Sequence, residues 1–225
     1  FKPMRPLVLY PGIVILFSLV AMACSSGDGQ DTPLEVSALL QGLEANIDLT
    51  STEFSNGGDI PAEYTCKGLD RSPPVAWGGV PEGTRSLTLI VDEPDEGHRG
   101  HWVIYDLPSE VTELPRYISI LEKTVQGGKQ GRNHTNGPGW SGPCPEEGGK
   151  NEGTYVFNIY ALDTVLGIEV EGGARRNDVI RAMEGHVIGY GQLIGKFCRS
   201  DAAAVGTSYA GGTLGRGSCP PLGSR

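Results

Sequence analysis

Apolar and polar positions follow a period of two through the middle of the chain, and three segments predict β-strands. They are Leu87–Val91, His101–Tyr105 and Tyr155–Leu162. The first carries apolar residues in both alternating sets, which is typical of a strand partly buried on two faces. The third is the longest and is rich in aromatic and β-branched residues. Strands therefore dominate the predicted core.

Helical spacing predicts one helix late in the chain. Apolar residues between 179 and 187 recur at this spacing, and Asn177 or Asp178 can cap the N-terminus. A weaker helical pattern over residues 30–48 predicts a short amphipathic helix ahead of the core. Because strands come first and helices late, we expect a mainly β fold, with an antiparallel β core and peripheral helices.

The first 24 residues differ in character from the rest. Two basic residues precede an apolar run over 7–23 that ends in small residues, which predicts a signal peptide over 1–23. The alternative is a retained membrane span, for which 17 residues containing Pro and Gly are near the lower limit. Cys24 resembles the acylated cysteine of a bacterial lipobox, although Ala21 and Met22 depart from that motif. We therefore expect an exported lipoprotein, anchored to the membrane of the cell envelope.

The remaining boundaries follow from composition. Residues 24–47 are predicted to hold the lipid-anchor tether and a linker, because 25–29 is short, polar and flexible in composition. Residues 48–199 are predicted to form the folded domain. The segment 200–225 is small, polar and Gly-rich, which predicts a disordered tail.

Overall composition supports one domain with appendages. Of 225 residues, 34 are Gly and 16 are Pro, and 38% are hydrophobic, which is enough for a single core. The scatter of Gly and Pro excludes collagen, coiled coils and long helical repeats. A formal net charge of −9 disfavours polyanion partners, so we expect no nucleic-acid binding.

The densest polar cluster spans Asp92–Trp102, between two predicted strands. It places four carboxylates and two imidazoles at one rim of the β core. A solvated charged loop is the simpler interpretation, but Pro94 stiffens the segment and His101 stands at a strand start. A partly buried imidazole beside carboxylates is typical of a functional site. Glu93, Asp95 and His101 are therefore candidate site residues, and His98 is a weaker one.

A second rigid segment is Gly142-Pro143-Cys144-Pro145, in which two prolines flank the cysteine. Glycine here permits the backbone to approach another group closely. A merely stiff loop is the alternative. Tyr155, at the head of the longest predicted strand, is a third candidate.

These segments belong to six ordered motifs that cover about 150 of the 225 residues. The motifs are Phe54-x5-Ile60-Pro61-x2-Tyr64-Thr65-Cys66, Ser72-Pro73-Pro74-x2-Trp77, Leu89-Ile90-Val91-Asp92-x-Pro94-Asp95, His101-Trp102-Val103-Ile104-Tyr105, Gly142-Pro143-Cys144-Pro145 and Tyr160-Ala161-Leu162-Asp163. Together they resemble the phosphatidylethanolamine-binding protein family, in particular its bacterial Raf-kinase-inhibitor-like branch.

The resemblance implies an antiparallel β-sandwich with peripheral and C-terminal helices. It also implies a rim pocket for a phosphate-like anion or a zwitterionic phosphoethanolamine head group. Carried over position by position, the implied ligand-binding residues are Glu93, Asp95, His101, Gly142, Pro143, Cys144, Tyr155 and Tyr190. Tyr190 lies in a segment that resembles the family's C-terminal helix.

Two positions depart from the family pattern. Glu93 stands where the family usually has Asp, which keeps the charge but extends it by one methylene. Gly153 stands where the family commonly has His, which removes a donor for an anion. Affinity for phosphate is therefore expected to be weaker, or the ligand to be different.

The sequence favours a binding module over an enzyme, with no cofactor. A protein-interaction or inhibitory role, directed at a kinase or protease, is the alternative. A hydrolase or metal-binding protein comes third: a Cys144–His101 dyad and a His98/His101 metal site are conceivable, but the usual nucleophile, phosphate-loop and zinc motifs are missing from the sequence.

Four cysteines besides Cys24 permit two disulfides in three pairings. Cys66 and Cys144 belong to motifs found in the family regardless of compartment, and we interpret them as free packing thiols. Cys198 and Cys219 are the favoured disulfide pair, because their bond would pin the tail.

Overall fold

The computed structural model describes residues 36–144 and 152–198. All of them belong to the compact unit Thr32–Arg225. The predicted signal peptide, Cys24 and the predicted tail with Cys219 lie outside the described residues. Among the helices that are described, none is both long and apolar enough to cross a membrane.

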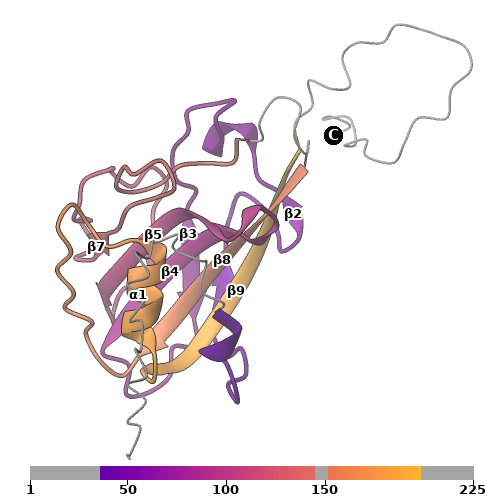
Figure 1. Cartoon of the computed structure of the whole chain (residues 1–225). Coiled ribbons are helices and arrows are strands. Elements are labelled where there is room, and N and C mark those ends of the chain that lie inside the picture. Colours follow the sequence, from indigo (N-terminus) through magenta and orange to yellow (C-terminus); the bar gives the residue numbers. More distant parts are fainter. Residues whose placement is uncertain (1–35, 145–151, 199–225) are drawn as a thin grey trace, which may run out of the picture. The chain divides into compact units, whose positions relative to one another are not determined.

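A six-stranded sheet forms the centre of the domain (Figure 1). In spatial order the strands are β2 (Gly58–Asp59), β9 (Val187–Cys198), β8 (Glu152–Leu162), β4 (Ser86–Glu93), β5 (Arg99–Pro108) and β7 (Lys129–Gln130). β2 runs parallel to β9, and all other neighbouring strands in this sheet are antiparallel.

The other elements are short. A three-stranded antiparallel sheet has the order β1 (Asp48–Thr50), β3 (Val75–Gly78) and β6 (Glu113–Leu114). Among the described residues, the single-turn 3₁₀ helices are η1 (Val36–Ala38), η2 (Ala62–Tyr64) and η3 (Pro94–Glu96), and the α-helix is α1 (Arg176–Met183). The predicted mainly β class is confirmed.

Hydrophobic residues pack on both faces of the six-stranded sheet. On one face, Leu89 and Phe157 belong to a cluster that also takes Trp77 from the small sheet. On the other face, Ile90 and Tyr160 pack with residues of α1. Every residue of β4 is buried, so the strand that was predicted to be partly buried on two faces is buried completely.

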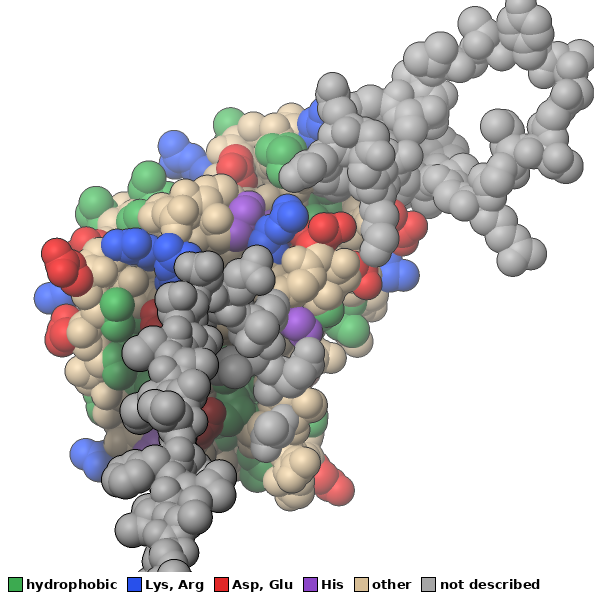
Figure 2. All heavy atoms as spheres, viewed as in Figure 1, with side chains coloured by type: hydrophobic (Ala, Val, Ile, Leu, Met, Phe, Trp, Pro, Cys, Tyr) green, Lys and Arg blue, Asp and Glu red, His purple; other side chains and the backbone are tan. Residues whose placement is uncertain are grey.

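The charged surface shows no separation of sign on the face drawn in Figure 2. Lys and Arg side chains lie among Asp and Glu side chains, and the hydrophobic groups are scattered between them. On this face the acidic excess of the chain does not gather into a single patch.

Three helix predictions need correction. The segment around Tyr190 is not a C-terminal helix but part of β9, which pairs with β8 along its length. Its Gly191 serves close packing, because a Cβ there would lie 2.1 Å from the carbonyl oxygen of Ile47. Within 30–48, the only helical element among the described residues is the turn η1. Arg175 is the N-cap of α1, and its N–H donates to the Asp178 carboxylate at 2.9 Å.

Candidate functional site

A β-bulge between β4 and β5 places His101 at the end of the sheet. Val91 pairs with Trp102 and Asp92 pairs with Gly100, so His101 has no partner in the register. A bulge redirects the extra side chain relative to strict alternation. The imidazole of His101 consequently lies on the same face as Tyr155, with ring centroids 5.0 Å apart and planes at 88°.

Both ring nitrogens of His101 face protein atoms. Nδ1 lies 2.6 Å from the carbonyl oxygen of Ser141, and Nε2 lies 3.4 Å from Oε2 of Glu93. Because a carbonyl oxygen only accepts hydrogen bonds, Nδ1 carries the hydrogen. The side chain is 2% exposed, so the protein encloses this imidazole almost completely.

Glu93 is the buried carboxylate of this site. Burial opposes its ionisation, but the hydrogen bond and charge of His101 and the hydrogen bond from Tyr155 outweigh burial, so the pKa of Glu93 is lowered. Burial, and then the Glu93 charge, raise the pKa of the Tyr155 phenol. Glu93 is therefore charged at neutral pH, and Tyr155 donates to it.

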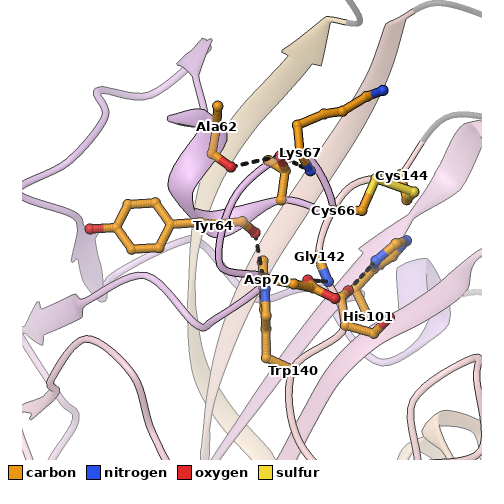
Figure 3. Close-up of a disulfide and its surroundings, with 11 residues drawn as sticks. Ala62, Tyr64, Cys66, Lys67, Asp70, His101, Trp140, Gly142 and Cys144 are labelled. Carbon is orange, nitrogen blue, oxygen red and sulfur yellow. Dashed lines mark hydrogen bonds between the residues drawn. A yellow bond between two sulfur atoms is a disulfide. The ribbon is translucent and has the colours of Figure 1, made fainter.

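The loop that carries Ser141 is anchored at several points (Figure 3). The N–H of Gly142 donates to the Asp70 carboxylate at 2.7 Å, and Nε1 of Trp140 donates to the carbonyl oxygen of Tyr64 at 3.1 Å. These contacts hold the loop against the segment that follows η2. Asp70 was not singled out from the sequence, because nothing local marks its long-range hydrogen bond.

A disulfide joins the same two segments, between Cys66 and Cys144. The interpretation of these cysteines as free thiols was therefore wrong. The physical reason is the fold, which brings positions 78 residues apart to a Cα–Cα distance of 5.4 Å, within bonding range. The Cys198–Cys219 pairing stays a prediction, because Cys219 lies outside the described residues.

The structure brings most, but not all, of the predicted site residues together. Gly142 and Pro143 are buried on the anchored loop, Cys144 is exposed beside them, and Asp95 is exposed on η3. Tyr190 is separated from this group. It pairs with Tyr160 on the sheet and packs in the cluster under α1, on the face opposite Tyr155. The expectation that Tyr190 lines the same site is wrong, because it rested on a helix that does not form.

Gly153 lies against the side chains of Glu93 and Tyr155. A Cβ at this position would lie 2.6 Å from Oε1 of Glu93 and 2.7 Å from the hydroxyl oxygen of Tyr155. The longer side chain of Glu93 thus occupies space that a side chain at 153 needs. The two departures from the family pattern are physically coupled.

His134 is a site residue that the sequence analysis missed. Its imidazole lies against that of His101, with ring centroids 4.5 Å apart, and the backbone N–H of His134 donates to the carbonyl oxygen of Gly100 at 2.7 Å. The local signal was only a glycosylation-like Asn133-His134-Thr135 triplet in a Gly-rich loop. No local pattern placed this loop over β5.

A second charged group lies on the opposite face of the sheet end. Nε of Arg176 donates to Oδ2 of Asp92 at 2.8 Å, and both side chains are buried. Nδ1 of His98 lies 3.5 Å from the same carboxylate, so His98 and His101 contact different acids. Among the described residues no three His, Cys, Asp or Glu groups are arranged to hold a metal ion.

The family model described as phosphatidylethanolamine-binding protein matches residues 50–198. The chain belongs to the phosphatidylethanolamine-binding protein family. A relative from Methanothermobacter thermautotrophicus, described only as a UPF0098 protein, is 42% identical over 155 residues, which are 68% of this chain and 99% of the relative. An Aquifex aeolicus protein with the same description is 40% identical over 157 residues, covering 69% of this chain and 90% of that protein.

Solved structures of this family share the fold. Escherichia coli YbcL, described as a member of the mammalian family, matches with a TM-score of 0.61 and 29% identity, over 68% of this chain and 98% of that one. A Chlamydia trachomatis homologue matches with a TM-score of 0.59 and 34% identity, over 68% of this chain and 97% of that one. The family fold is consistent with a ligand-binding module.

Proposed function

We propose that this chain binds a small phosphate-bearing or zwitterionic ligand in a pocket at the rim of the six-stranded sheet. The observation that carries the proposal is the convergence of Glu93, His101 and Tyr155 with the loop at Ser141. These groups come from β4, β5, β8 and the disulfide-anchored loop. A site assembled from four separate segments is well suited to hold one ligand.

Charges of both signs at this rim suit a zwitterionic head group. Glu93 and the exposed Asp95 offer carboxylates to an ammonium group. An imidazole N–H at this rim and the Arg99 guanidinium offer donors to a phosphate. Arg99 is the first residue of β5, and its Nη2 lies 3.5 Å from Oε2 of Glu96. Phosphoethanolamine carries both groups on one short chain, so it matches this arrangement better than inorganic phosphate alone.

Calorimetry on the full chain tests the proposal with three probes: phosphoethanolamine, ethanolamine and inorganic phosphate. We expect phosphoethanolamine to bind most tightly. Glu93→Gln removes the charge that faces the ammonium. It is expected to lower the affinity for phosphoethanolamine by about tenfold and the affinity for inorganic phosphate by less. Glu184→Gln, which neutralises an exposed acid after α1, is the matched control. Absence of binding by any probe at millimolar concentration would refute the proposal.

Native mass spectrometry of the purified full chain complements the calorimetry. A co-purifying small molecule would identify the physiological ligand directly. Its mass is expected to fit a compound with a phosphate or phosphoethanolamine group. A tightly held ligand with neither a phosphate nor a positive charge would contradict the proposed chemistry.

We also propose that the chain is exported and anchored through an acylated Cys24. The Cys66–Cys144 disulfide supports export, because such bonds persist mainly in oxidising compartments. Labelling bacterial cells that express the chain with an alkyne fatty acid tests the anchor. Label is expected on the wild-type chain and not on Cys24→Ser. Equal labelling of both would overturn it.

A further inference from the structure

The two imidazoles at the rim differ in what they face. His101 is 2% exposed, with Nδ1 on Ser141 and Nε2 toward Glu93. One side of its ring is covered by Tyr155 and another by His134. A ligand in solvent therefore cannot reach a nitrogen of His101 unless one of these contacts opens. His134, by contrast, is exposed while its ring packs on His101.

The loop that carries His134 is held in a defined conformation. The side chain of buried Asn133 accepts from the N–H of Thr135 at 2.9 Å and donates to the carbonyl oxygen of Gly139 at 3.0 Å. The N–H of Asn133 donates to the carbonyl oxygen of Gly137 at 2.8 Å. With the bond from His134 to Gly100, these contacts fix the backbone position from which the imidazole projects. Ligand contacts benefit from such preorganisation.

We propose that His134, rather than His101, is the imidazole that contacts the anionic group of the ligand. Arg99, whose charge acts on His134, is the second cation of this subsite. His101 then acts as a positioning residue that holds Glu93 and supports the ring of His134. This inference rests on the proposed function and specifies which residue meets the phosphate.

Electrostatics at His134 link this contact to proton uptake. Although the residue as a whole is exposed, the ring of His134 loses part of its hydration where it packs on His101. This loss of hydration, and then the charges of His101 and Arg99, lower the pKa of His134 to about 4, while the Gly100 carbonyl and Glu93 act in the opposite direction. His134 is therefore neutral at pH 7 in the free protein. A bound anion offsets the positive charge that Arg99 directs at His134 and favours the protonated imidazole. Anion binding at this residue consequently takes up a proton, and affinity rises as the pH falls from 7 toward 5.

Calorimetry of the full chain with inorganic phosphate at pH 7 and with sulfate between pH 5 and 7 tests this inference. Sulfate keeps its charge over this range, so its pH dependence reports protein groups alone. His134→Gln is expected to lower the affinity for phosphate by about tenfold and to remove most of the pH dependence of sulfate affinity. His134→Arg, which is permanently charged, is expected to retain affinity without proton uptake. His186→Gln is the control, because His186 pairs with Asp163 at the other end of β8.

The outcomes separate this inference from the proposed function. If Glu93→Gln weakens phosphoethanolamine but His134→Gln leaves phosphate affinity within twofold of wild type, the assignment of His134 is wrong and the function stands. If the wild-type chain binds none of the probes, both fail. Loss of phosphate affinity in His134→Gln alone, with equal far-ultraviolet circular dichroism for all variants, supports both.

Discussion

Nδ1 of His101 lies 2.6 Å from the carbonyl oxygen of Ser141, which stands 40 residues further along the chain. This hydrogen bond connects the bulge of β5 to the loop that the Cys66–Cys144 disulfide anchors. It also fixes which nitrogen of His101 points toward Glu93. The orientation of the buried imidazole thus depends on a covalent bond elsewhere in the rim.

Removing the disulfide is expected to reduce stability substantially. In Cys66→Ser/Cys144→Ser, the unfolded chain is freed from a cross-link over 78 residues, and the free energy of unfolding should fall by roughly 2–5 kcal/mol. Urea unfolding measures the change. A reductant should lower the stability of the wild-type chain more than that of the double variant, because only the wild-type chain has the Cys66–Cys144 bond to lose. A wild-type curve that does not respond to reductant would show that the cross-link contributes little.

Acid is expected to destabilise the wild-type chain more than Glu93→Gln. The folded-state pKa of Glu93 is lowered, so the stability that it contributes is present above its unfolded-state pKa and is lost as the pH falls through the folded value. Denaturant unfolding between pH 7 and pH 3 measures this difference. The difference in the free energy of unfolding between the wild-type chain and Glu93→Gln should be largest at pH 7 and should shrink toward pH 3. A constant difference would mean that Glu93 titrates alike in both states.

Breaking the ion pair between Asp92 and Arg176 is expected to cost about 3–5 kcal/mol, because Arg176→Met leaves a buried carboxylate without its counter-charge. Asp92→Leu/Arg176→Met should be less destabilised than the sum of the single variants, since it removes both charges. The exposed pair of Arg116 and Glu53, at 2.6 Å, is the control. Its disruption by Arg116→Met is expected to cost less than about 1 kcal/mol in the same unfolding assay.

Restoring a side chain at position 153 is expected to conflict with Glu93. Gly153→His places atoms within 2.6 Å of the carboxylate and should cost about 1–3 kcal/mol. Glu93→Asp shortens that side chain, so the double variant should recover part of the loss. Thermal unfolding of the four proteins gives the coupling energy. Gly78→Ala is the control, because nothing lies within 4 Å of a Cβ there. Additive effects of the two changes would show that they are independent.

The strands were predictable because their signal is local. Side chains alternate along a strand, so burial on one or both faces appears directly in the order of residues. The segments predicted at Leu87–Val91 and Tyr155–Leu162 accordingly lie within β4 and β8. β9 was not predicted, because the segment around Tyr190 was assigned to a helix from the family resemblance. Gly191 serves contact with Ile47, and that contact is invisible in the local pattern.

The candidate site was predictable in part. Glu93, His101 and Tyr155 were found from charge, strand position and family motifs, and the structure brings them together. His134 was missed and Tyr190 was misplaced. Each depends on which face of the sheet a distant segment covers, and neither charge nor hydropathy near those residues encodes that relation.

The amino-acid sequence by itself determined that strands form, that one core is present and that acids and imidazoles gather where two strands meet. Only the tertiary structure decided that Cys66 bonds to Cys144, that a bulge turns His101 toward Glu93 and that His134 covers His101. The physical reason is the separation along the chain over which each kind of relation acts. Periodicity and charge act between residues close in the chain, whereas these three relations arise from sheet register and loop packing between segments far apart in it.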